Sequence, residues 1–429
     1  MDCLLLLLIV YIMYLLLALI FSNGRLLSPS VVFSASFTFM LLLAYMFKEI
    51  LGFRVNEATF QVLSFGGFIF VATEILVQWF LQRKGNILCK SSTGNEIIAL
   101  SDKVVNFLII FLGLSTIICI YVFFINTTGE SIAVRMMQYK FALLYDDSSV
   151  KYRVYISQLY KINMCIAYFS SYIFIYNLAN NGISSIRKLK YISIITLFGI
   201  YGVFFNAARQ PVIEILLFLP LVYLSLHLKR KDRKKVFLLL RKTLPVIILV
   251  GIIFYYTATM VGRPETERGM LEYIAVYFCG GLYSFNLHVY EPARNALWGQ
   301  SSFSDIYSVL IKLGAVSEAA DMRYHDFDLY GNTVTIFGRW YEDFGQLGVY
   351  IMTFLVSAFF AIFFYKKIVP EKNVFKVNHI SKLIYSKFII GLLWAGYDDR
   401  IRPLFSVSTL CFVLGIILLW RIFITRKVE

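Results

Sequence analysis

Long uninterrupted apolar segments alternate with short polar segments along the whole chain. Strands of a membrane barrel would alternate apolar and polar residues, whereas a run of about twenty apolar residues has the length of a membrane-crossing helix. Lipid offers the backbone no hydrogen-bond partner, so such runs must be helical. The pattern predicts an all-α polytopic membrane protein with about eleven transmembrane helices. These are expected at approximately 3–21, 28–47, 59–81, 104–126, 154–178, 191–206, 211–227, 243–262, 344–365, 383–397 and 403–421.

The fifth of these segments, 154–178, is more polar than the others and carries Lys161. A cation in a spanning helix avoids lipid and faces the interior of the helix bundle. We therefore expect this helix to pack against protein. The remaining spans are rather free of charge, and the charged residues collect at their outer edge.

The basic residues fix the orientation of the chain. Every strongly basic loop follows an odd-numbered predicted span, and cytoplasmic loops are the ones enriched in Lys and Arg. The N-terminus is therefore expected outside and the C-terminus in the cytoplasm. These residues are Arg83, Lys84, Lys90, Arg187, Lys188, Lys190, Lys229, Arg230, Lys231, Arg233, Lys234, Lys235, Lys366, Lys367, Lys372, Lys376, Arg426 and Lys427.

Composition agrees with this class, with 59% hydrophobic and only 16% charged residues. The net charge of +15 lies largely in short loops between apolar runs, so it indicates membrane orientation rather than nucleic-acid binding. The six cysteines show no paired spacing, so neither a disulfide framework nor a thiolate metal site is expected. The first apolar run lacks a basic start, and we interpret it as a membrane helix rather than a removed signal peptide.

No soluble domain or internal repeat is evident, so residues 1–429 are predicted to form a single integral membrane domain. The largest polar segment, 263–343, is expected on the outer face as a loop that carries short helices. Its part from Tyr273 to Val289 is apolar and contains Gly280 and Gly281, which favours an interfacial or re-entrant helix pair.

Arginines are frequent in the predicted outer segments. The planar guanidinium binds phosphate oxygens through two parallel hydrogen bonds and keeps its charge in a site of low dielectric constant. Contacts to anionic lipid headgroups and structural ion pairs are the simpler explanation for any one of them, but the set favours a shared anionic ligand. These residues are Arg135, Arg209, Arg263, Arg268, Arg294, Arg323, Arg339, Arg400 and Arg402.

Two arginine positions are the most informative. Arg209 lies in a very short turn between two predicted spans, where it is either a surface side chain at the membrane or a ligand of a lipid-linked phosphate. Arg263 and Arg268 flank Glu265 where the eighth span emerges, with helix-breaking residues beside them. This group is either an ion-pair cluster or an anion site in which Glu265 is a base.

Two further clusters carry polar chemistry. His325 lies beside Asp326 and Asp328, but no second histidine follows at a ligand spacing, so a general base or a polar loop is favoured over a metal site. Asp343 lies four residues after Arg339, so the two share a helix face and are expected to pair. Asn332 and Thr333 are candidate caps for that helix.

The family resemblance rests on the second cluster. The stretch Gly331-Asn332-Thr333-Val334-Thr335, followed by Tyr341, Asp343, Phe344, Gly345 and Gly348, resembles the bacterial oligosaccharide repeat-unit polymerases, the Wzy-type O-antigen and capsule polymerases. Members of that family run a Gly-Asn-x-x-Thr element into a Tyr-x-Asp-x-Gly element where a membrane helix begins. The Arg209 turn, the position of Arg263, the number of spans and the large outer loop are similar too.

The resemblance implies a GT-C-like fold in the bacterial inner membrane and a reaction without metal or cofactor. A glycan would move from undecaprenyl pyrophosphate to the non-reducing end of another lipid-linked repeat unit. The phosphate ester activates the donor, which accounts for the lack of a nucleotide-binding motif. The expected partners are the lipid-linked oligosaccharide, the lipid bilayer and, as a further candidate, a chain-length regulator protein.

The resemblance also implies roles for the candidate residues. The substrate-binding set is Arg209, Arg263, Arg268, Arg339, Asn332 and Arg400. The catalytic set is His325, Glu265 and Asp343, with His325 favoured as the base because the two carboxylates lie close to arginines that lower their basicity. An O-antigen ligase, with the same donor and a lipid A-core acceptor, and a flippase or other transporter of lipid-linked oligosaccharide remain the alternatives.

Overall fold

The computed structural model describes residues 2–83, 97–98, 100–145, 149–180, 182–227, 241, 270–290, 298–316, 333–369 and 379–424. Within these ranges the chain is helical and contains no strand. The α-helices are α1 (Cys3–Phe21), α2 (Pro29–Met46), α3 (Lys48–Leu51), α4 (Glu57–Arg83), α5 (Asp102–Ile125), α6 (Ile132–Tyr145), α7 (Arg153–Ala179), α8 (Ser185–Asn206), α9 (Gln210–Leu226), α11 (Met270–His288), α12 (Ser304–Lys312), α13 (Ile336–Phe363), α14 (His379–Leu393) and α15 (Val407–Phe423). A π-helix, η5 (Phe364–Ile368), extends α13, and a 3₁₀-helix, η6 (Arg402–Phe405), precedes α15.

Seven of the described helices are long and apolar enough to cross a membrane, as expected for a polytopic α-helical membrane protein. They are α1, α2, α4, α5, α7, α8 and α13 continued by η5. The predicted spans at 211–227, 383–397 and 403–421 correspond to the shorter helices α9, α14 and α15. The predicted span at 243–262 lies outside the described residues.

The chain divides into two compact units. Unit 1 contains α1 to α4 and α11 to α14, with η5 and η6, and unit 2 contains α5 to α9 and most of α15.

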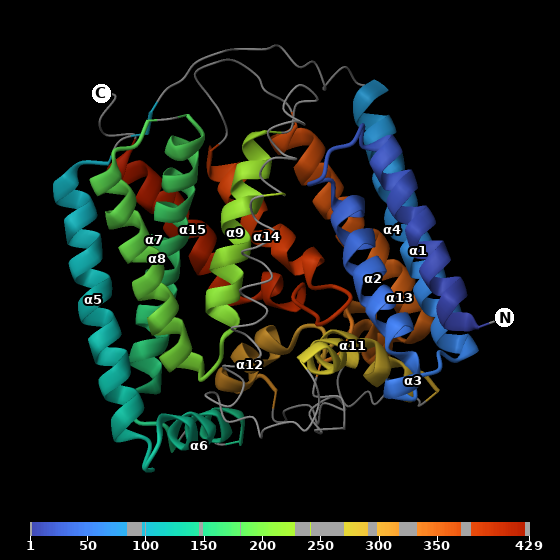
Figure 1. Ribbon diagram of the computed structural model, residues 1–429, viewed down its shortest axis with the longest axis horizontal. Helices are drawn as coiled ribbons and strands as arrows, with labels where there is room; N and C mark the ends of the chain where they lie inside the picture. The colour runs from blue at the N-terminus through green and yellow to red at the C-terminus, as the bar shows by residue number, and fades with distance from the viewer. Residues whose placement is uncertain are drawn as a thin grey trace. The chain divides into compact units, whose positions relative to one another are not determined.

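Unit 1 is built on α1, α2, α4 and α13, which lie side by side in Figure 1. Aromatic rings fill the space between them. Phe33 stacks on Phe70 with ring centroids 4.0 Å apart, and the edge of Phe337 meets Phe33 at 6.0 Å. Gly66 of α4 leaves the space that the Phe337 ring occupies, since a Cβ there would approach that ring to 2.9 Å. This aromatic packing holds α13 against α4.

A buried carboxylate closes one end of this packing. Glu74 of α4 is 3% exposed and accepts hydrogen bonds from the Ser28 hydroxyl at 2.5 Å, the Ser30 amide at 2.5 Å and the Tyr365 hydroxyl at 3.0 Å. Ser28 and Ser30 stand at the start of α2, where backbone amides lack helical partners. Glu74 therefore fixes the start of α2. The predicted third span thus contains a buried acidic side chain, although the spans were expected to be rather free of charged residues.

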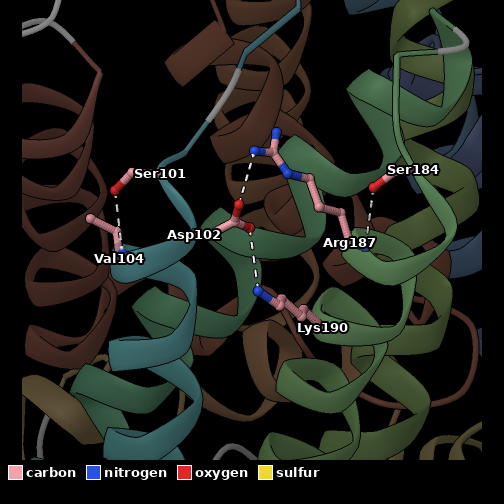
Figure 2. Close-up of polar contacts among 6 residues, drawn as sticks. All are labelled: Ser101, Asp102, Val104, Ser184, Arg187 and Lys190. Carbon is pink, nitrogen blue, oxygen red and sulfur yellow. Dashed lines mark hydrogen bonds and ion pairs between the residues drawn. The ribbon is translucent and has the colours of Figure 1, made fainter.

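Unit 2 is organised around α7, in whose apolar stretch 78% of the residues are buried, against 39% for α5 and for α8. The expectation that this polar helix faces protein is therefore confirmed. The Tyr201 hydroxyl of α8 donates to the Ile156 carbonyl of α7 at 2.6 Å. Asp102, in the first turn of α5, accepts from Arg187 at 3.4 Å and from Lys190 at 3.3 Å, both from α8 (Figure 2).

Three helices in the predicted outer segments were not expected individually: α3 between the second and third predicted spans, α6 between the fourth and fifth, and α12 in segment 263–343. The helix pair predicted around Gly280 and Gly281 is wrong, because α11 runs as one helix through both glycines. Gly281 does not break the helix. It allows another backbone to approach closely, since a Cβ there would overlap the Tyr397 carbonyl oxygen. Figure 1 places α11 and α12 at the same end of unit 1 as α3.

Candidate functional site

The candidate site in unit 1 is built on the start of α13. That helix begins at Ile336, earlier than the predicted start at 344, and its N-cap is Thr335, so the predicted capping role of Thr333 is wrong. Gly345 has φ 65° and ψ −166°, which interrupts the helix. Segment 336–344 is therefore a short helical piece set off from the apolar part that follows, and its break coincides with the start that hydropathy alone predicted.

Asp343 anchors a neighbouring segment rather than standing free. Its Oδ1 accepts from the Ser301 amide at 3.0 Å and its Oδ2 from the Ser302 amide at 2.6 Å. Asp343 is buried, with 4% of the residue exposed. Both carboxylate oxygens are thus engaged with backbone just before α12. The structure assigns Asp343 a positioning contact to this segment rather than to an arginine.

Arg339 is a buried cation held by a second carboxylate. The residue is 8% exposed, and its Nη1 lies 3.8 Å from Glu342 Oε2 and 3.3 Å from the Ser301 hydroxyl oxygen. The same hydroxyl donates to Glu342 at 2.6 Å. The expected pair with Asp343 is wrong, because Glu342, one residue earlier, takes that place. A guanidinium fixed in this way can meet an anion without losing further side-chain freedom.

Three chain segments join beside Arg339 through backbone hydrogen bonds. The Thr335 amide donates to the Gly281 carbonyl at 3.3 Å, and the Ile336 amide donates to the Ala395 carbonyl at 3.1 Å. The Asp399 amide donates to the Val334 carbonyl at 3.1 Å. The start of α13, the helix α11 and the 394–401 loop after α14 therefore form one junction.

Asp399 is the carboxylate at the centre of this junction. It is 7% exposed, and its Oδ1 accepts from the amides of Ile401 at 3.0 Å and Arg402 at 3.1 Å. Burial raises the pKa of Asp399 above its ordinary value, although Arg402 and Arg339 nearby act in the opposite direction. The preceding residue, Asp398, forms an ion pair with Arg400, with 2.7 Å between Oδ2 and Nη2.

Aromatic rings line the same junction. Tyr277 of α11 stacks on Tyr397 with ring centroids 4.8 Å apart, and Phe278 stacks on Trp394 at 6.1 Å. Trp394 also lies 5.3 Å from Tyr397. Tyr277, Phe278 and Trp394 are partly exposed, whereas Tyr397 is buried. The junction thus combines buried charge with aromatic surface.

Four of the residues that the sequence singled out lie in the described part of unit 1: Arg339, Asp343, Arg400 and Arg402. Arg339 and Arg402 both act on the charge of Asp399. Arg209 lies in unit 2, at the N-cap of α9, in the very short turn that was expected there. The residues Arg263, Glu265, Arg268, His325 and Asn332 lie outside the described part of the chain.

Sequence reasoning missed Glu342, Asp399 and the two serines of segment 301–302. The run Asp398-Asp399-Arg400 between two apolar segments was the available signal, but only its arginine was considered. Within the described ranges no group of three or more His, Cys, Asp or Glu residues is arranged to hold a metal ion. No protein-family model, no curated protein and no solved structure matches this chain.

Proposed function

We propose that this protein polymerises lipid-linked oligosaccharide repeat units. The glycan on undecaprenyl pyrophosphate is transferred to the non-reducing end of a second lipid-linked repeat unit. Breaking the glycosidic bond to pyrophosphate leaves a multiply charged group beside the membrane, and fixed cations stabilise charge that develops in the transition state.

The observation that carries the proposal is the buried guanidinium of Arg339 at the start of an apolar helix. Glu342 and the Ser301 hydroxyl hold it in place, and Asp343 ties the adjoining segment to the same helix. Preorganised charge of this kind fits an anionic leaving group better than a neutral one. The stretch that carries the family resemblance, from Gly331 to Gly348, contains Arg339, Glu342 and Asp343.

The proposal includes a membrane arrangement. The chain crosses the bacterial inner membrane about eleven times in a GT-C-like fold, with its N-terminus outside and the site on the outer side. Arg209, Arg263, Arg268, Arg339, Asn332 and Arg400 bind the donor or acceptor, and His325, Glu265 and Asp343 are the candidates that sequence offers for the catalytic groups. The positive-inside distribution of basic residues supports this orientation.

The proposal is tested with purified full-length protein in lipid vesicles and one defined undecaprenyl-pyrophosphate-linked repeat unit. We expect products that differ by whole repeat units, together with released undecaprenyl pyrophosphate. Arg339→Lys keeps the charge and loses the planar fork, so it should slow the reaction strongly while the protein stays folded. Absence of any product longer than one repeat, with folded wild-type protein and intact substrate, contradicts the proposal.

The same vesicles separate the alternatives. A ligase would transfer the glycan only when lipid A-core is added, and a flippase would move the lipid-linked unit across the vesicle membrane without forming a glycosidic bond. Either result would replace polymerisation as the function of the chain.

A further inference from the structure

One oxygen of Asp399 has no hydrogen-bond partner among the described residues. Its Oδ1 is occupied by two backbone amides, but Oδ2 is buried and accepts no hydrogen bond. Nε of Arg402 is likewise buried and donates to no described atom. Leaving such groups unpaired inside a protein is costly, and the cost is larger for charged groups. Arg402 lies close enough for its charge to lower the pKa of Asp399, so two buried atoms without partners on these neighbouring side chains indicate a position prepared for a ligand.

The chemistry of the two atoms restricts that ligand. A carboxylate oxygen only accepts hydrogen bonds and a guanidinium nitrogen only donates them. A hydroxyl group satisfies both, since its proton is donated to Oδ2 while its oxygen accepts from Nε. A phosphate would meet Arg402 well but would be repelled by Asp399. A hydroxyl is therefore favoured over the anionic part of the substrate.

The surroundings favour a sugar hydroxyl. Trp394 and Tyr397 belong to the same loop as Asp399, and the Tyr277 ring stacks on Tyr397. Trp394 and Tyr277 are partly exposed, and aromatic faces of this kind pack against the C–H face of a sugar ring. Arg339 stands close enough to act on the charge of Asp399, which links this position to the cation proposed to meet the leaving group.

We propose that Asp399 and Arg402 bind the attacking hydroxyl of the acceptor sugar, and that Asp399 accepts its proton. This inference rests on the polymerase function proposed above. In the step, the O–H bond breaks and its proton passes to Oδ2 of Asp399. The oxygen forms a bond to the anomeric carbon of the donor, and the pyrophosphate departs with the electron pair of the bond that breaks.

Asp343 does not suit this role, because both of its oxygens already accept backbone amides. Asp399→Asn is the sharper test, because the asparagine oxygen can replace Oδ1 and preserve the two backbone contacts while the proton-accepting oxygen is lost. Glu49→Gln serves as the control, because that carboxylate is 90% exposed.

The experiment measures turnover of full-length protein in vesicles with defined lipid-linked repeat units. Asp399→Asn should lower kcat about a hundredfold or more, with little change in KM, whereas Glu49→Gln should equal wild type. Arg402→Lys lacks Nε and should raise the KM for acceptor about tenfold or more. Thermal unfolding of each variant shows whether it is folded.

The pH profile separates a base from a structural residue. Asp399 must be ionised to act, so kcat should fall on the acid side as the carboxylate becomes protonated. Burial has the largest effect on the pKa of Asp399 and raises it, as does Asp398, whereas Arg402 and Arg339 lower it by less. The acid limb of the profile should therefore lie above the range of an ordinary aspartate. The limb should be absent from Asp399→Asn.

The outcomes are distinguishable. Wild-type protein that makes no polymer contradicts the proposed function itself. Polymer from wild type together with near-normal kcat in folded Asp399→Asn overturns the role of Asp399 and indicates that the position holds only water. Loss of the acid limb in His325→Ala but not in Asp399→Asn would transfer the proton to the histidine.

Discussion

Replacing Asp343 by asparagine tests how the site is held together. The aspartate accepts two backbone hydrogen bonds with a buried carboxylate, and bonds to charged groups contribute about 1.5–3 kcal/mol each. Asparagine has one acceptor oxygen, so one bond survives in a weaker neutral form, and an N–H group faces the other backbone amide. We expect the attachment of segment 298–303 to weaken by about 2–3 kcal/mol.

Amide hydrogen exchange measures this loss directly. Because 1.4 kcal/mol corresponds to a factor of ten, the amides of Ser301 and Ser302 should exchange about thirtyfold to a hundredfold faster in Asp343→Asn. Glu130→Gln, which removes an exposed carboxylate in unit 2, should leave them unchanged. If Asp343→Asn exchanges at the wild-type rate in this segment while remaining folded, Asp343 is not its anchor.

Three further outcomes are expected. Leu313→Cys, in the predicted outer segment 263–343, should react with an impermeant thiol reagent in intact cells, because this position is 74% exposed. Ser381→Cys, on the predicted cytoplasmic side, should not react, and the reverse pattern would refute the orientation. Arg209→Ala should abolish long glycan at normal protein level and Arg209→Lys should restore part of it, whereas full polymer from the alanine variant would remove this arginine from the site. Gly281→Ala should destabilise the junction by about 1–3 kcal/mol, seen as a lower melting temperature, because its Cβ would overlap a backbone carbonyl; an unchanged melting temperature would show that the two segments separate freely.

The long apolar helices could be predicted well from sequence. The predicted segments 3–21 and 154–178 match α1 and α7 to within about a residue at each end. Hydropathy works here because the preference for lipid is a property of each local run and depends little on what packs against it. Lys161 and its polar neighbours correctly indicated that this helix packs against protein, because lipid disfavours polar side chains wherever the helix lies.

The positions of α6 and α12 at the predicted outer side could not be found in this way. α6 contains no long apolar run and is held by tertiary contacts, with Met136 and Tyr139 buried in a cluster that includes Phe123. α12 is nine residues long and has no buried residue. Short helices of this kind depend on distant partners, which a single sequence does not reveal.

The candidate site was predicted in part. Arg339 and Asp343 were singled out from the spacing of one local segment, and that segment does begin a helix at a junction of three chain parts. Their actual partners are Glu342 and the segment 301–302, and Asp399 comes from the loop after another helix. Contacts across such sequence distances follow from tertiary packing, so spacing rules alone misassigned the ion pair.

The interruption at Gly345 separates the short helical piece that carries Arg339 from the apolar part of α13. Bilayers differ in thickness, and a spanning helix adjusts by tilting at modest cost. A continuous helix would transmit that tilt to Arg339. With the chain turned at Gly345 and Asp343 fastened to segment 301–302, a tilt of the apolar part together with α4 is not passed on directly to Arg339. We therefore expect activity to vary little across membranes of different lipid chain length.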